Sequence, residues 1–164
     1  MNLEHVAVMT QEVLSGLNLR DGGTYIDGTF GRGGYTRAIL DAATTRVFGI
    51  DRDPTAITFG SNLIDKYDGR LTLLQGRFGD MASIMAEQGV NHVDGVMLDL
   101  GVSSPQIDDP DRGFSFRLDG PLDMRMEHQG ATAADFINEA PEEEIADVIF
   151  QYGVKHNNYT LGRR

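Results

Sequence analysis

A stretch of glycines interrupted by polar residues, Asp-Gly-Thr-Phe-Gly-Arg-Gly-Gly at positions 27–34, has the composition of a ligand-binding turn. It follows the apolar residues 24–26 and precedes residues 36–40, which suit a helix, so we predict a tight strand-to-helix turn. Glycine has no Cβ and lets a ligand approach the backbone, and the beginning of a helix attracts anionic groups. The turn therefore indicates nucleotide binding, while ordinary packing of a helix on a sheet is the alternative explanation for its glycines.

An acidic residue stands where a nucleotide site would use it. The second apolar run, residues 47–50, ends in Asp51, which follows the glycines by about 20 residues, the spacing that brings a carboxylate onto ribose hydroxyls. Asp51 thus favours the nucleotide interpretation over simple packing.

Two classes of nucleotide-binding protein commonly have such a turn, and the position of the third glycine distinguishes them. A dinucleotide fingerprint that starts at Gly31 requires glycine at position 36, which is Thr36. The stretch fits better the first motif of S-adenosylmethionine-dependent methyltransferases, an acid followed by spaced glycines. Asp27, Gly31 and Gly33 are in register with that motif, and Thr29 replaces its usual first glycine. Methyl transfer is therefore the leading hypothesis.

The elements that must position these residues alternate between strand and helix. Apolar runs predict strands at 24–26, 47–50, 71–75 and 93–100. Helical spacing and capping residues predict helices at 10–19, after Asp53-Pro54, after Asp80, after the capping box Thr132–Asp135, and from Pro141. The alternation predicts an α/β fold with a doubly wound parallel sheet, whose ligand lies at the carboxyl ends of the strands.

Residues 101–131 show no helix or strand periodicity. Loops of this length are usually functional or disordered. The segment carries aromatic residues and methionines, including Phe114, Phe116, Met124 and Met126, which are rare in solvated linkers. We therefore predict a binding loop.

Composition limits the possible partners and compartments. The 164 residues contain no cysteine, and the four histidines lack the spacing of a metal site. No stretch resembles a signal peptide or a membrane span, so we expect a cytoplasmic protein. The net charge of -11 opposes nucleic-acid binding through the overall field, so any RNA contact requires a local basic patch. The candidates for such a patch are Arg32, Arg37, Arg112, Arg117 and Arg125.

Several motifs together closely resemble the RsmH (MraW) family of bacterial 16S rRNA cytosine N4-methyltransferases. The resemblance covers residues 5 to about 153 and is carried by the segments 27–34, 50–54, 98–106, 112–116 and 120–126. The opening residues 5–9 also look like the start of the family, although Ala7 stands where proline is frequent. The resemblance implies a Rossmann-like class I methyltransferase fold, strand order 3-2-1-4, followed by helices.

The resemblance also implies roles for individual residues. It places S-adenosylmethionine on Gly33, Gly34 and Tyr35, with Asp51 on the ribose, Phe78 beside the adenine, and Asp99 and Gln106 around the methyl-bearing end. For Phe78 a core aromatic is the competing interpretation. The implied partner is 16S rRNA in the P-site region of the small ribosomal subunit.

Methyl transfer to a cytosine amino group needs orientation more than activation. The sulfonium is already reactive, so no metal is required, but the amino lone pair is delocalised into the ring. Acceptors that hold the amino N–H groups can turn the lone pair toward the methyl and receive a proton. We assign this role to Asp99 and to carbonyls around Ser103, Ser104 and Pro105; a strand-end cap and plain turn formers are the alternatives.

The chain departs from the family after Gly153, where the family continues with more helices and the remaining strands. We predict a methyltransferase segment at 1–131, the start of a helical region at 132–153 and an atypical tail at 154–164, with a truncation or a shifted reading frame near Gly153. The fourth strand would then lie at an edge, with Val96 and Leu98 unsupported. A non-catalytic cofactor-binding fragment and a methyltransferase of small molecules or proteins remain alternatives.

Overall fold

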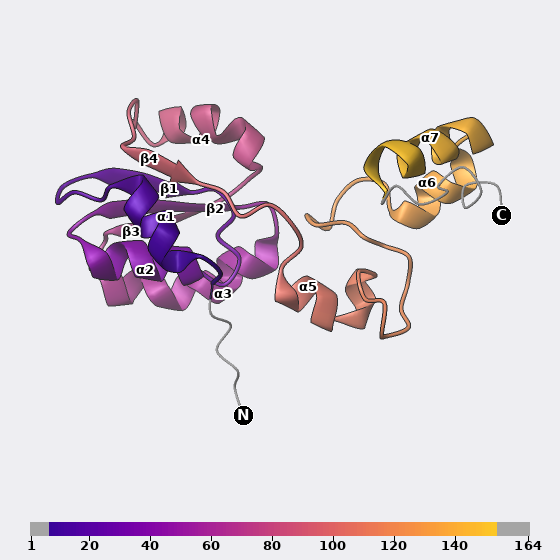
Figure 1. Ribbon diagram of the computed structural model, residues 1–164, viewed down its shortest axis with the longest axis horizontal. Helices are drawn as coiled ribbons and strands as arrows, with labels where there is room; N and C mark the ends of the chain where they lie inside the picture. The colour runs from indigo at the N-terminus through magenta and orange to yellow at the C-terminus, as the bar shows by residue number, and fades with distance from the viewer. Residues whose placement is uncertain (1–6, 154–164) are drawn as a thin grey trace. The chain divides into compact units, whose positions relative to one another are not determined.

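The computed structural model describes residues 7–153, which form two compact units that divide between Gly101 and Val102 (Figure 1). The first unit contains one parallel sheet with strand order β3-β2-β1-β4, which confirms the predicted order and the Rossmann-like α/β methyltransferase fold. Its strands are β1 (Thr24–Asp27), β2 (Arg46–Asp51), β3 (Leu71–Gln75) and β4 (Gly95–Met97).

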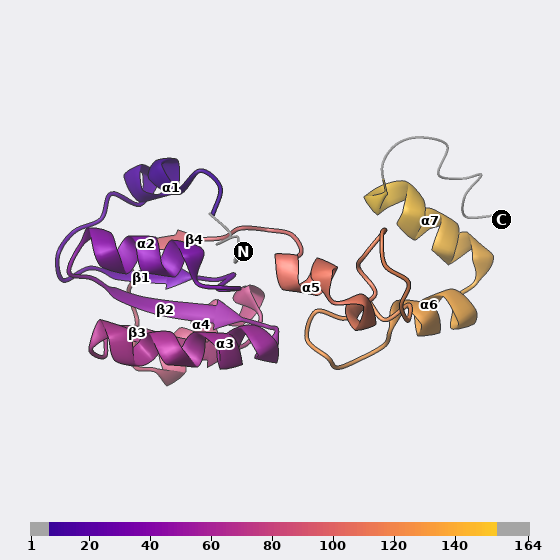
Figure 2. The ribbon, with the colours of Figure 1, turned by 90° about the horizontal axis from the view of Figure 1, so that it is seen from below.

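Helices cover both faces of this sheet (Figures 1 and 2). Tyr25 and Val47 point to one face, where they pack with α2 (Gly34–Ala42), and Ile26 and Phe48 point to the other. The first face also receives side chains of α1 (Thr10–Leu17) and α3 (Pro54–Ile64), while the second is covered by α4 (Met81–Glu87). Neighbouring residues of a strand point to opposite faces, so one apolar strand supplies both halves of the core.

The start of α3 confirms its predicted cap, whereas the start of α4 does not. Asp53 accepts a hydrogen bond from the backbone N–H of Thr55 at 2.9 Å, and Pro54 occupies the first helical position. Asp80 makes no such bond, and the prediction of an Asp80 cap is wrong. The chain already turns as a 3-10 helix over Phe78–Asp80, so Asp80 has φ -99° and ψ 9° instead of the extended backbone of a cap.

The fourth strand is shorter than residues 93–100 and lies at an edge. In the described sheet, β4 pairs with β1 alone. Val96 in β4 and Leu98 just after it are 41% and 40% exposed, so both are partly open to solvent. The predicted edge is thus confirmed, and the strand is short because pairing ends where β1 turns away at Asp27.

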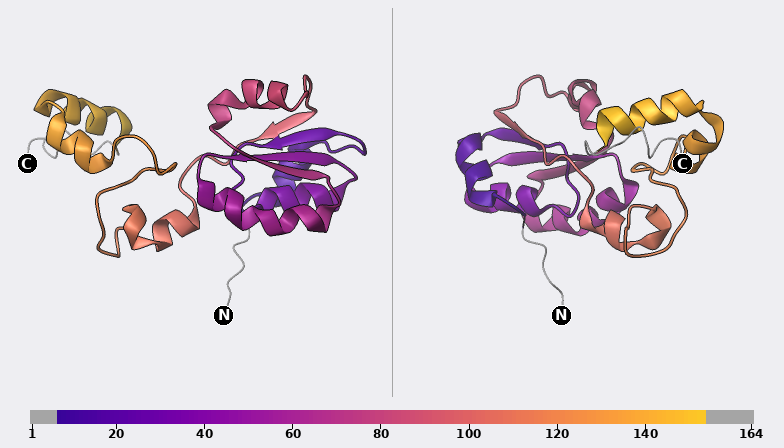
Figure 3. Two further views of the ribbon diagram at one scale, coloured as in Figure 1. Left: turned by 180° about the vertical axis from the view of Figure 1, so that it is seen from behind. Right: turned by 45° about the vertical axis from the view of Figure 1, so that its right-hand side comes forward.

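The second unit begins with two short helical elements inside the segment that the sequence left without periodicity. They are α5 (Ser104–Asp108) and a 3-10 helix at Pro110–Arg112, each too short to give a periodic signal. The predicted capping box opens α6 (Ala133–Glu139), and α7 (Glu142–Tyr152) follows. Figure 3 shows these helices from two further directions. The predicted tail, residues 154–164, lies outside the described residues, and the division at residue 131 stays a prediction.

A buried arginine organises the loop of the second unit. Arg112 donates to the carbonyls of Arg125 and Met126 at 3.0 and 3.1 Å. The backbone passes so closely that a Cβ on Gly113 would lie 2.4 Å from the Pro121 carbonyl oxygen. The segment therefore has a specific fold of its own. None of the helices in residues 7–153 combines the length and apolarity that crossing a bilayer requires.

Candidate functional site

The glycine turn joins β1 to α2 and has two kinds of glycine. Gly33 caps α2 with φ +69°, and a Cβ there would lie 2.9 Å from the ring of Phe30, so packing requires this glycine. Gly31 has φ +51°, and a Cβ there would meet only the Thr29 carbonyl oxygen, at 3.8 Å. The space beside Gly31 is therefore open, as a turn that receives a ligand requires.

Asp51, at the end of β2, is fastened to this turn. Its Oδ2 accepts the N–H of Gly31 at 2.7 Å, and its Oδ1 accepts the N–H of Asp53 at 2.9 Å. Burial raises the pKa of Asp51, while these two backbone hydrogen bonds oppose the rise. Each carboxylate oxygen retains a second lone pair, so the group can also accept ribose hydroxyls.

The segment after β4 reaches the same turn. The backbone N–H of Asp99 donates to Thr29 Oγ1 at 2.8 Å, and the Asp99 side chain is exposed. A Cβ on Gly28 would lie 2.5 Å from Leu98 and 3.2 Å from the Cβ of Phe78, so both pack on the turn. Phe78 is 39% exposed and belongs to neither core cluster, which weighs against its interpretation as a core aromatic.

Asp27 lies beneath the turn, fully buried. Its Oδ2 accepts the hydroxyl of Thr36 at 2.7 Å and its Oδ1 accepts the N–H of Thr29 at 3.3 Å. Burial raises the pKa of Asp27 to about 6, helped by the negative charge of Asp51 and opposed by these hydrogen bonds. Asp27 braces the turn from below and does not face a ligand.

The raised pKa of Asp27 predicts an unusual pH dependence of stability. A carboxyl with a pKa of about 6 in the folded chain and 3.8 when freely solvated takes up a proton on folding. At a pH above both pKa values, the charged carboxylate therefore lowers the free energy of unfolding by about 3 kcal/mol. This loss of stability becomes smaller as the pH falls through 6 toward 4. We expect Asp27→Asn to remove this dependence.

Urea unfolding at about pH 7.5 and about pH 5 measures the effect. The free energy of unfolding of the unchanged chain, relative to Asp27→Asn, should rise by on the order of 1 kcal/mol at the lower pH. Equal differences at both pH values would show that Asp27 titrates normally in the folded chain.

The side chain of Tyr35, in the first turn of α2, is buried. It is 8% exposed, and its hydroxyl donates to the carbonyl of Val8 at 2.7 Å. Burial and the neighbouring Asp99 carboxylate raise the pKa of Tyr35. Gly34 packs beside Ala7, since a Cβ on Gly34 would lie 3.1 Å from the Ala7 Cβ. The predicted contacts of Gly33, Gly34 and Tyr35 with a cofactor stay predictions.

The remaining predicted site residues, Ser103, Ser104, Pro105 and Gln106, belong to the second unit. They form the first turn of α5, where Gln106 Oε1 accepts the backbone N–H of Ser103 at 3.0 Å. The Gln106 side chain is buried and serves as part of this cap. Their roles in catalysis or cofactor binding are not tested by this geometry and stay predictions.

The proposed basic patch is smaller than the sequence indicated. Arg112 is buried inside the second unit, so its assignment as a phosphate contact is wrong. Arg125 binds Asp123 through several nitrogens, and these bonds lower the pKa of Asp123 to about 2. Of the three arginines in this loop, Arg117 is the exposed one without an ion pair among the described residues.

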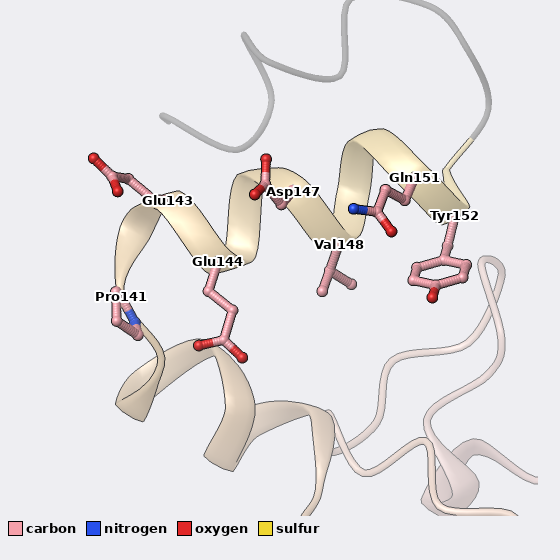
Figure 4. A pocket seen from close by; sticks show the side chains of 7 residues that line it. All are labelled: Pro141, Glu143, Glu144, Asp147, Val148, Gln151 and Tyr152. Carbon is pink, nitrogen blue, oxygen red and sulfur yellow. The ribbon is translucent and has the colours of Figure 1, made fainter.

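A hollow of about 500 Å³ lies against α7 in the same unit (Figure 4). Its lining includes Glu143, Glu144 and Asp147, with Val148 and Tyr152 beside them. Three carboxylates repel phosphate, so this hollow is unsuited to RNA. No group of histidine and acidic side chains within residues 7–153 has an arrangement that could hold a metal ion.

Two contributions to the site were not found from the sequence. The hydroxyl oxygen of Thr29 accepts the backbone N–H of Asp99, which lies 70 positions later in the sequence. The carbonyl of Val8 accepts the hydroxyl of Tyr35, which lies 27 positions later. Neither pair has a local signal, because only the folded sheet brings these positions together. The one sign of the first pair in the sequence is that Thr29 replaces the usual first glycine of the methyltransferase motif.

The first unit is a 3-2-1-4 parallel sheet with a glycine turn after β1, an acidic residue at the end of β2 and another after β4, so that these three features lie at the carboxyl ends of the strands. This is the arrangement of a Rossmann-like α/β methyltransferase fold.

Comparison with known proteins identifies the particular family. A family model described as the MraW methylase family matches residues 2–163, and the chain belongs to this family. Among its curated relatives is the ribosomal RNA small subunit methyltransferase H of Paramagnetospirillum magneticum, 56% identical over 149 residues, or 91% of this chain and 47% of the relative. The proteins of the same name from Rhodospirillum centenum and Granulibacter bethesdensis are 54% and 55% identical, covering 97% of this chain and 48% of each relative. The chain thus spans about half the length of the curated relatives it matches.

Proposed function

We propose that this chain binds S-adenosylmethionine and transfers its methyl group to the exocyclic N4 of a cytidine in 16S rRNA of the small ribosomal subunit. The observation that carries the proposal is the convergence of two acidic residues on one turn. Asp51 is bonded to Gly31 and Asp99 to Thr29, so the ends of β2 and β4 meet at the turn after β1. The family membership and the names of the curated relatives support the substrate class.

The residues at the turn suit such a cofactor. Asp51 would accept the ribose hydroxyls, the open backbone at Gly31 would admit the amino-acid part, and Phe78 would contact the adenine with its exposed ring. When bound, the cofactor supplies a methyl group already activated by its positive sulfur. The protein then has to exclude misaligned approaches of the nucleophile.

Asp99 would hold the substrate amino group. Its exposed carboxylate can accept one N–H of that group, which turns the nitrogen lone pair away from the ring, and can receive the proton as the new C–N bond forms. The backbone bond to Thr29 fixes where this carboxylate stands. Carbonyls near Ser103–Pro105 stay the proposed source of a second acceptor.

Labelled methyl transfer tests the proposal. Small ribosomal subunits from cells that lack the modification are incubated with the chain and labelled S-adenosylmethionine, and binding of the cofactor is measured by calorimetry. We expect binding together with label in N4-methylcytidine of 16S rRNA. Label in another nucleoside, in protein or in a small molecule would overturn the substrate assignment, and absence of both binding and label would overturn the function.

A second candidate, cofactor binding without methyl transfer, is favoured by one observation. In the described sheet β4 is an edge strand of only three residues, and the side chain of Val96 in it is 41% exposed. Binding of S-adenosylmethionine without label in any acceptor would select this candidate.

The exposed Arg117 yields a prediction for RNA binding. One lost phosphate contact reduces the slope of log affinity against log salt by about 1. We therefore expect Arg117→Ala to weaken binding to a 16S rRNA fragment severalfold at low salt and to lower the salt slope. Arg46→Ala, which removes another exposed arginine at the start of β2, is the matched control. Equal affinities for both variants would exclude Arg117 from the RNA surface.

A further inference from the structure

The turn between β1 and α2 carries two arginines whose side chains are held in place. The guanidinium carbon of the exposed Arg32 lies 4.0 Å from the centre of the Phe59 ring. The Arg32 carbonyl accepts a hydrogen bond from Arg37 Nη1 at 2.8 Å. A planar guanidinium that stacks on an aromatic face has a fixed orientation and keeps its N–H groups available for other partners. The turn therefore presents two positioned cations.

The close packing of α3 on the turn brings Phe59 to Arg32. A Cβ on Gly60 would collide with the ring of Phe30, so glycine at this position lets α3 approach the turn. Phe59, the residue before Gly60, is nevertheless 43% exposed and is part of neither core cluster. Its ring therefore contributes little to the core and is available as a platform for the guanidinium.

The charges of these two arginines are not neutralised by the chain itself. In the part of the chain that the structure describes, neither arginine has an acidic partner. Asp51, beside the turn, accepts the backbone N–H groups of Gly31 and Asp53 instead, and the first turn of α2 contains no acidic residue. In a chain with 25 acidic and 14 basic residues, two unpaired arginines at one turn favour an anion that comes from outside the chain.

We propose that Arg32 and Arg37 bind backbone phosphates of the rRNA substrate and that Phe59 is a positioning residue for Arg32. The inference rests on the proposed function, because that function brings rRNA to the carboxyl ends of the strands, where the turn lies. The planar fork of an arginine matches the oxygens of a phosphate. Phosphates carry no base sequence, so these arginines contribute affinity and orientation, while the cytidine is recognised by other groups.

Binding of the full chain to a 16S rRNA fragment, measured without cofactor over a range of salt concentrations, tests the arginines. We expect Arg32→Ala and Arg37→Ala each to weaken binding about tenfold at low salt and to lower the slope of log affinity against log salt by about 1. Arg46→Ala is the matched control, because it removes an exposed arginine at the other end of β2. It should bind as the unchanged chain does.

Calorimetry with S-adenosylmethionine distinguishes the phosphate from another anion, the carboxylate of the cofactor. Arg32→Ala and Arg37→Ala should bind the cofactor as the unchanged chain does. Loss of cofactor affinity with unchanged RNA affinity would overturn the proposal and assign the arginines to the cofactor.

A double-mutant cycle tests Phe59. Phe59→Leu removes the aromatic face and keeps an apolar side chain, so we expect RNA affinity to fall about two- to fivefold with an unchanged salt slope, as loss of an exposed cation–π contact allows. In the Arg32→Ala background the same change should have no effect, because Phe59 acts through Arg32. A merely structural role would weaken binding equally in both backgrounds and would overturn the assignment of Phe59.

The outcomes separate this inference from the proposed function. RNA affinities of Arg32→Ala and Arg37→Ala equal to that of Arg46→Ala would overturn the phosphate contact, even if the unchanged chain methylates rRNA. Selective loss of affinity in these two variants would support the contact, even if no label enters rRNA. An unchanged chain that does not bind the fragment would overturn this inference, and labelled methyl transfer would still decide the proposed function.

Discussion

Asp99→Asn is expected to lower the turnover of methyl transfer by at least about a hundredfold at saturating cofactor, since a positioned proton acceptor contributes about 10² to 10⁴. Asparagine keeps the size of the side chain and the backbone bond from position 99 to Thr29 Oγ1. It loses the negative charge and the ability to receive a proton. Orientation by the remaining amide oxygen would leave some activity.

Turnover must be separated from affinity in this experiment, because Asp99 is also a predicted cofactor contact. Single-turnover rates with labelled S-adenosylmethionine, measured at several cofactor concentrations, make the separation. Asp65→Asn, which removes an exposed carboxylate after α3, controls for the change in net charge. Full turnover of Asp99→Asn at saturation would remove Asp99 from the proton transfer.

Asp51→Ala is expected to weaken S-adenosylmethionine binding by at least about a hundredfold. The carboxylate would lose two charge-assisted hydrogen bonds to ribose hydroxyls, each contributing about 1.5 kcal/mol or more, and tenfold in affinity corresponds to 1.4 kcal/mol. The variant also frees the N–H of Gly31, which loosens the turn. Calorimetry with the cofactor measures the loss.

Two further variants help to explain that loss of cofactor affinity. Asp51→Asn keeps an oxygen that can accept the Gly31 N–H and should bind more tightly than Asp51→Ala. Asp41→Ala removes an exposed carboxylate near the end of α2 and should bind like the unchanged chain. Unaltered affinity in Asp51→Ala, with an unaltered melting temperature, would mean that Asp51 does not hold the ribose.

The sequence predicted most of the first unit because its signals are local. The glycine turn, the apolar strands and the Asp53-Pro54 start of α3 each follow from neighbouring residues, and together they define the 3-2-1-4 sheet. The spacing between the glycines and Asp51 predicted a contact with ribose, which stays a prediction, whereas the bond of Asp51 to Gly31 was not predicted from the sequence. The sheet then brings Asp99 to the same turn.

The parts that were missed depend on contacts between distant segments. Nothing near Arg112 reveals that it binds two carbonyls inside its own loop, and an arginine in a loop is usually exposed. Nothing near Tyr35 reveals that its hydroxyl meets Val8. The Asp80 cap failed for a related reason, because the conformation of the preceding 3-10 turn decides where a capping side chain points.

The open side of β4 has a consequence for handling the protein in solution. Within residues 7–153, β4 has no outer neighbour, and such an edge presents unpaired peptide groups that can template strand addition from another molecule. Here the strand is only three residues long, and the net charge of -11 makes copies repel one another. Solubility therefore depends on that repulsion, and it should be lowest in concentrated salt and near the isoelectric pH of 4.6, where the repulsion vanishes.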